Sequence, residues 1–213
     1  MTLQTLYRPV GLVELRLIFE AGMRAFPARL PEQPIFYPVT NEAYAAQIAR
    51  EWNAAEPELA CGYVLSFALP AGYLERFDKK VVGGAEHEEL WVPAEVLPDF
   101  NARLEGLISV GRCFFGERFR GYAAPTPSFG GLDEAFHRED AAAQLAALLA
   151  NEGRLVEFVE AYPTTIFLHH PYWRGLSAGA GAGASDDERS RVLAKLAAVW
   201  RARLAIPLPG ASR

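Results

Sequence analysis

Residues 83–93 read GGAEHEELWVP, and this run of glycines, charged residues and then apolar residues predicts a turn that leads into a strand. Side chains alternate along a strand, so one face carries His87, Glu89 and Trp91 and the other carries Glu88, Leu90 and Val92. Pro93 is expected to end the strand, because it has no backbone N–H to donate. The charged residues at 86–89 crowd the start of an otherwise apolar strand, which makes this stretch the most unusual in the chain.

Outward from this strand, short apolar and alternating runs predict further strands, and apolar residues at three- and four-residue spacing predict helices. The predicted strands cover 3–10, 35–39, 62–69, 79–82, 107–115 and 164–169. The predicted helices cover 12–23, 41–53, 94–104, 139–150 and 186–204. Strands that alternate irregularly with short helices favour an α+β fold with a mixed sheet over a regular βαβ array.

The character of the chain changes after residue 116, where Gly, Pro and aromatic residues become frequent. We therefore expect a core at 1–116 and a C-terminal extension at 117–213. Within the extension, the low-complexity stretch GLSAGAGAGAS at 175–185 is typical of a flexible linker. Ser185 and Glu188 form a capping-box pattern that opens the helix at 186–204, and its apolar stripe predicts that it docks on the rest of the protein.

Composition limits the function classes. The 213 residues are 51% hydrophobic and 22% charged, as in a globular protein, and the formal net charge of −5 disfavours nucleic acid as a generic partner. Cys61 and Cys113 lie far apart without metal-type spacing, so both are expected to be buried thiols. With no membrane-spanning run and no leader pattern, we expect a soluble, cytoplasmic protein with no membrane partner.

Common catalytic motifs are missing from the sequence. It contains no CxxC pair, no Ser/His/Asp arrangement and no phosphate-binding glycine loop. His169 and His170 are adjacent and would point to opposite faces of a strand, so we expect them to pack and not to bind a metal ion. On these grounds the sequence predicts no metal site.

Three stretches together resemble a known family. YRPVGLVEL at 7–15, FPARLPEQPIFYPVTNEAYAAQIAREWN at 26–53 and GGAEHEELWVPAEVL at 83–97 are similar to small bacterial proteins labelled as ADP-ribosylation proteins. The resemblance spans roughly residues 6 to 120. It implies an ADP-ribosyltransferase-like fold with a split sheet, and an enzyme that uses NAD as substrate, transfers ADP-ribose to an unknown acceptor and releases nicotinamide. That acceptor could be a protein, a nucleic acid or a small molecule.

The resemblance also implies roles for four residues. Arg8 would hold a ribose or phosphate of NAD through its guanidinium, and Tyr37 would stack on the nicotinamide ring. Glu89 would stabilise the positive charge that develops on the ribose as nicotinamide leaves, and would hold a ribose hydroxyl. His87, two residues earlier on the same strand face, would position the acceptor and take its proton.

Two alternatives stay open from the residues alone. A one-residue shift would make Glu86 and Glu88 the acidic pair, on the opposite face of the strand. The acidic cluster is also typical of a solvated edge strand. In that case the protein would be a catalytically inactive relative that serves as a protein-interaction or ligand-sensing module, with 122–136 and the C-terminal helix supplying contacts. The enzyme requires that Arg8, Tyr37 and Glu89 line one pocket; the module does not.

Overall fold

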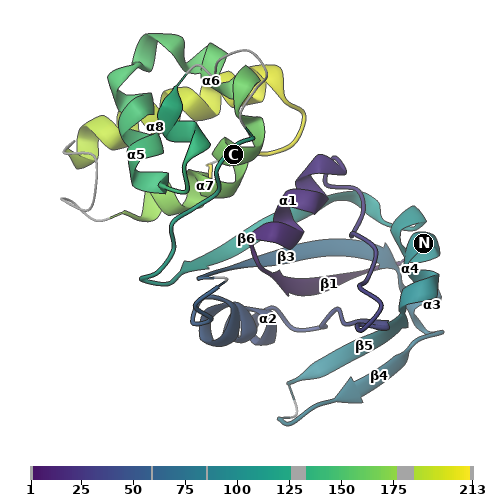
Figure 1. The fold of residues 1–213 in the computed structure, drawn as a ribbon. Coiled ribbons are helices and arrows are strands. Elements are labelled where there is room, and N and C mark those ends of the chain that lie inside the picture. The colour runs from purple at the N-terminus through teal and green to yellow at the C-terminus, as the bar shows by residue number, and fades with distance from the viewer. Residues whose placement is uncertain (1, 59, 85, 126–132, 177–184, 212–213) are drawn as a thin grey trace. The chain divides into compact units, whose positions relative to one another are not determined.

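The computed structural model describes residues 2–58, 60–84, 86–125, 133–176 and 185–211. The chain divides into two compact units, Met1–Arg118 and Phe119–Arg213. Figure 1 shows strands and helices in the first unit, whereas the described elements of the second unit are all helices. The α+β class expected from the sequence is therefore confirmed.

The first unit contains six strands and several short helices. Its strands are β1 (Leu3–Val10), β2 (Ile35–Phe36), β3 (Cys61–Pro70), β4 (Asp78–Val81), β5 (Glu88–Pro93) and β6 (Glu105–Phe115). Its helical elements are α1 (Leu12–Glu20), α2 (Glu42–Ile48), the π-helical turn η1 (Ala49–Asn53), α3 (Ala71–Leu74), the 3₁₀ turn η2 (Ala94–Val96) and α4 (Leu97–Ala102).

The strands form two three-stranded sheets, in the orders β1-β3-β6 and β2-β5-β4. Every pairing between these strands is antiparallel, so the expectation of a mixed sheet is wrong. Alternation along a strand reports which face is buried but carries no information on the direction of the neighbouring strand.

Val39 pairs with a strand of each sheet. Val39 exchanges both backbone hydrogen bonds with Tyr7 of β1, each 2.8 Å long, and bridges to Glu89 of β5 on its other side. The next hydrogen-bonded pair of this ladder would be Pro9 with Tyr37, but proline has no N–H. Pro9 therefore accounts for the point at which β1 and the segment after β2 part.

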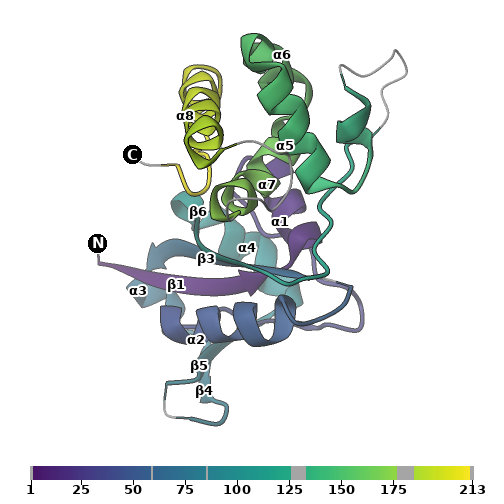
Figure 2. The ribbon, with the colours of Figure 1, turned by 90° about the vertical axis from the view of Figure 1, so that its left-hand side faces the viewer.

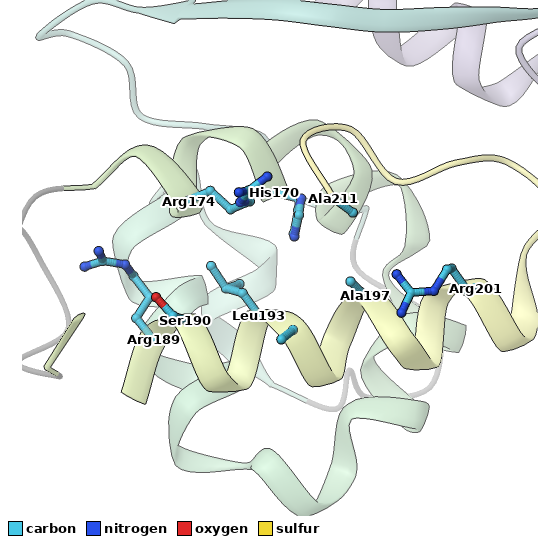
Figure 3. A pocket seen from close by; sticks show the side chains of 9 residues that line it. His170, Arg174, Arg189, Ser190, Leu193, Ala197, Arg201 and Ala211 are labelled. Carbon is cyan, nitrogen blue, oxygen red and sulfur yellow. The ribbon is translucent and has the colours of Figure 1, made fainter. Parts of the chain in front are cut away.

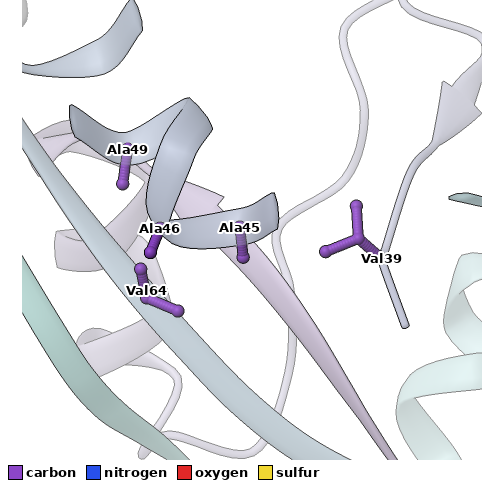
Figure 4. Packing of buried hydrophobic residues seen from close by; sticks show 5 residues of the cluster. All are labelled: Val39, Ala45, Ala46, Ala49 and Val64. Carbon is purple, nitrogen blue, oxygen red and sulfur yellow. The ribbon is translucent and has the colours of Figure 1, made fainter. Parts of the chain in front are cut away.

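Helices α1 and α2 lie on opposite sides of the β1-β3-β6 sheet (Figures 1 and 2). On the α2 side, small residues let the helix approach the strands closely. Figure 4 shows this cluster, which consists of Val39, Ala45, Ala46, Ala49 and Val64, each at most 1% exposed. Tyr7, Tyr44 and Phe114 pack against it.

Gly62 in β3 lies directly against the backbone of the η1 turn. A Cβ atom at this position would lie 2.2 Å from the carbonyl oxygen of Ala49, the first residue of η1. Only glycine permits this contact, because the neighbouring atom belongs to the backbone and cannot move aside. The position of η1 against β3 therefore depends on the absence of a side chain at residue 62.

The second unit is a group of helices. They are η3 (Glu134–His137), α5 (Ala141–Ala150), η4 (Glu152–Arg154), α6 (Leu155–Ala161), α7 (Pro163–Gly175) and α8 (Asp186–Arg203). Contacts join α5, α6 and α7 to α8, and α8 buries Val192, Leu196 and Trp200. At its start, the Ser185 hydroxyl accepts from the Glu188 N–H at 3.2 Å. Most of the expected linker at 175–185 lies outside the described residues, as does 126–132 within the expected contact region 122–136.

The strand expected at 164–169 is wrong, because these residues belong to α7. A short apolar run rich in β-branched and aromatic residues predicts a buried strand, but a buried helix gives the same pattern. Seven residues of α7 are buried. The helix therefore has no distinct polar face from which its 3.6-residue period could be recognised in the sequence. Pro163 at the first helical position is the signal that favoured a helix.

Candidate functional site

The sheet geometry sets which side chains accompany Glu89. Residues that pair directly across antiparallel strands project from the same face, so Tyr7, Val39 and Glu89 share one face. Helix α2 covers this face, since Tyr7 and Val39 pack with its alanines. The neighbouring residues Arg8 and Glu88 project from the opposite face by the two-residue period.

Tyr44 of α2 fixes the carboxylate of Glu89. Its hydroxyl donates to Glu89 Oε1 at 3.1 Å. Asn41 caps the helix that carries it, and the Asn41 side chain accepts from the N–H groups of Ala43 and Tyr44. Burial, and then the negative charge of Glu89, raise the pKa of Tyr44. The phenol therefore stays protonated at neutral pH and keeps donating to the carboxylate.

His87 stacks on the same tyrosine. The rings of His87 and Tyr44 are 4.1 Å apart between centroids and inclined by 13°. The preceding turn holds the imidazole, because His87 Nδ1 lies 3.3 Å from both the Gly84 N–H and the Val82 carbonyl. Gly83 in this turn has φ of +100°, a conformation that favours glycine. Tyr44 thus lies between the two residues expected to do the chemistry.

Tyr37 lies on the same face, two positions along from the Val39–Glu89 bridge. Its ring meets Trp91 edge to face, with centroids 5.3 Å apart. Lys80 places its ammonium 3.6 Å from the centroid of Trp91. Tyr37 is 36% exposed, so part of the residue is accessible to solvent.

Arg8 is buried on the other face and is already paired. Its Nε and Nη2 donate to the two carboxylate oxygens of Glu14 at 2.7 and 3.1 Å. Its guanidinium lies 4.6 Å from the centre of the Phe36 ring, and Nη1 donates to the Tyr37 carbonyl at 3.3 Å. Glu14 lies in the first turn of α1, so its ion pair with Arg8 links this helix to β1.

The structure therefore divides the four expected residues. Glu89, His87 and Tyr37 share one face, whereas Arg8 touches Tyr37 only through its backbone carbonyl. Glu88, the alternative acidic residue, faces Lys79 at 3.9 Å on the other side of β5. Sequence reasoning missed Tyr44, which it placed in a helix but could not bring to Glu89, because that contact spans 45 residues.

A pocket of about 470 Å³ opens beside Arg8. Its lining includes Glu14, Arg29, Leu30 and Val13, but neither Tyr37 nor Glu89. The enzyme requires one pocket that Arg8, Tyr37 and Glu89 line together. This pocket does not have that lining.

The second unit has a pocket of its own, of about 630 Å³, shown in Figure 3. Arginines 174, 189 and 201 line it, together with His170. Arg189 is paired with Asp186 at 2.8 Å, and His170 Nδ1 meets the Pro209 carbonyl at 2.5 Å. Burial lowers the pKa of His170 to about 4.

Among the described residues, no group of three or more His, Cys, Asp or Glu side chains could hold a metal ion. Within the same residues, no helix combines the length and apolar character needed to cross a membrane. Comparison with known proteins finds no matching family, no matching curated protein and no matching solved structure.

Proposed function

We propose that the first unit is an ADP-ribosyltransferase-like enzyme that transfers ADP-ribose from NAD and releases nicotinamide. The observation that carries the proposal is the Glu89 carboxylate, held by the Tyr44 hydroxyl at 3.1 Å on one face with His87 and Tyr37. The division of the strands into two three-stranded sheets, bridged at Val39, is in keeping with the split sheet that the family resemblance implies.

Each residue of this face has a chemical task in the proposal. Glu89 stabilises the positive charge that develops on the ribose as the bond to nicotinamide breaks and its electron pair leaves with the ring nitrogen. Tyr44 keeps that carboxylate in one position, which spares the cost of ordering it during the reaction. His87 takes the proton of the acceptor as its nucleophile bonds to the ribose, and Tyr37 stacks on the departing ring.

The residues fit NAD only in part. Glu89, His87 and Tyr37 fit the nicotinamide ribose end. Arg8 does not fit the role implied for it, because both oxygens of Glu14 already occupy its guanidinium and it projects from the opposite face. Arg8 therefore has no step in the proposed reaction. The unpaired state of Cys61 and Cys113 agrees with the cytoplasm as the compartment of such an enzyme.

A second candidate is the catalytically inactive module that binds a ligand or a protein. The specific observation in its favour is that the pocket beside Arg8 excludes Glu89 and Tyr37. A ligand-sensing module does not need a pocket that contains this carboxylate.

Titration of wild type and Glu89→Gln with NAD, read by thermal shift and by nicotinamide release, separates the two candidates. The enzyme predicts that NAD stabilises both proteins by mass action and that only wild type releases nicotinamide. Absence of release from wild type, with or without NAD binding, would reject the enzyme and leave the module.

A further inference from the structure

The pocket beside Arg8 carries a cationic floor that the Glu89 face does not use. Arg8 is 8% exposed, and the side chain of Arg29 is 12% exposed. Arg29 Nη1 lies 3.9 Å from Glu14, so two guanidinium groups share a single carboxylate. Arg8, Arg29 and Glu14 together therefore carry a net charge of +1 at the floor of the pocket.

Arg29 also has an unsatisfied hydrogen-bond donor. Its Nε is buried and has no acceptor among the described residues, while its Nη2 donates to Gln33 Oε1. A buried donor without a partner costs free energy, so the described part of the chain leaves the Arg29 guanidinium incompletely satisfied. Burial, and then the neighbouring Arg8, lower the pKa of Arg29.

The mouth of the pocket is apolar. Val13, Leu17 and Leu30 line it and are 58%, 37% and 55% exposed, so large hydrophobic side chains face solvent around a cationic floor. Exposed apolar side chains that gather around one cavity are typical of a binding site. The volume of about 470 Å³ is in the range of small-molecule pockets.

We propose that this pocket binds a small amphiphilic carboxylate, whose anionic end pairs with the guanidinium of Arg29 and whose apolar body contacts Val13, Leu17 and Leu30. A single carboxylate balances the excess charge, and the apolar rim favours a hydrocarbon body over a polar one. The inference goes beyond the proposed transferase and does not depend on it, because Glu89 and Tyr37 do not line the pocket.

The test uses octanoate, at concentrations below micelle formation, and isothermal titration calorimetry with the full chain. Octanoate should bind wild type, whereas octanol and octylammonium at the same concentrations should not. Arg29→Met removes the charge and the donors while keeping an unbranched apolar side chain, and it should weaken octanoate binding at least tenfold. Leu30→Asp should weaken it similarly, because it places a carboxylate at the apolar mouth.

Arg24→Gln, which alters an arginine outside the pocket lining, is the matched control and should leave octanoate affinity unchanged. Circular dichroism of each variant verifies that it is folded. Failure of octanoate to bind wild type overturns the proposal, as does equal binding to wild type and Arg29→Met. Displacement of octanoate by NAD would also overturn it, because the pocket would then belong to the transferase site. Nicotinamide release is measured separately, so either proposal can fail alone.

Discussion

The Arg8 guanidinium donates to the backbone carbonyl of Tyr37 at the position where the ladder between β1 and the segment after β2 breaks. Pro9 cannot supply the N–H that this carbonyl would otherwise accept, and the preceding arginine supplies one from its side chain. Pro9 thus ends the pairing between the two segments, and Arg8 supplies the hydrogen bond that the Tyr37 carbonyl would otherwise lack. This explains why Arg8 is buried, and it gives Arg8 a structural task that is independent of any ligand.

Replacement of Arg8 by methionine should therefore lower stability. The variant loses two charge-assisted bonds to Glu14 and one to Tyr37, and leaves a half-buried carboxylate beside Arg29 alone. We expect a loss of about 2–3 kcal/mol in the free energy of unfolding, measured by urea denaturation. Arg16→Met breaks the exposed pair with Glu20 and should cost less than about 0.5 kcal/mol. Equal losses in the two variants would contradict the role given to Arg8.

Gly62→Ala should disturb the packing of η1 on β3. The added methyl group would lie 2.2 Å from the Ala49 carbonyl oxygen, so the helical turn must shift, at an expected cost of at least about 2 kcal/mol. Gly72→Ala is the control, because nothing lies within 4 Å of its Cβ position and it belongs to helix α3. That change should be neutral or slightly stabilising. A thermal melt of both variants checks the pair, and unchanged stability in Gly62→Ala would refute the close contact.

Tyr44→Phe should reduce nicotinamide release while leaving the fold intact. The change removes the hydroxyl that holds Glu89 and keeps the ring that stacks on His87. Loss of one positioning hydrogen bond predicts a fall in kcat of about tenfold, with little change in KM. The measurement is steady-state release of nicotinamide from NAD. A rise in KM at constant kcat would show that Tyr44 binds substrate and does not position the carboxylate.

The second unit should lose stability in mild acid because of His169. Its Nε2 accepts from the Tyr122 N–H at 2.8 Å, and its Nδ1 lies 2.7 Å from Gln144 Oε1, so the neutral ring satisfies both partners. Burial lowers its pKa to about 3. The unfolded chain, with a pKa of about 6.5, binds the proton first. Stability is thus complete above pH 6.5 and falls as the pH decreases from 6.5 towards 3, by up to about 1.4 kcal/mol per pH unit.

His169→Gln separates this effect from general acid denaturation. The variant should be less stable than wild type at pH 7, because it breaks the network with Gln144, but it should lose less stability between pH 7 and pH 5. Urea denaturation at the two pH values measures both quantities. If wild type is equally stable at pH 7 and pH 5, the account of His169 is wrong.

The sequence predicted local structure better than the contacts between distant segments. The strand at 88–93 followed from alternation and Pro93, and the α2 helix from Asn41 and its apolar spacing. The helix at 163–175 was missed because burial on all sides hides its period. The contact of Tyr44 with Glu89, and the placement of Arg8 on the opposite face, depend on strand pairing through Val39, which no local pattern encodes.

In the proposed reaction Glu89, and not its neighbour Glu88, carries the chemistry. The most direct measurement is the rate of nicotinamide release from saturating NAD by wild type, Glu89→Gln and Glu88→Gln. Both variants change one carboxylate of β5 to an amide, but only Glu89 is bonded to Tyr44, whereas Glu88 faces Lys79 on the opposite face. We predict that Glu89→Gln loses at least about 100-fold in rate, in line with loss of an electrostatic stabiliser, while Glu88→Gln retains wild-type rate. Equal rates in the two variants, or no release by wild type, would contradict the account.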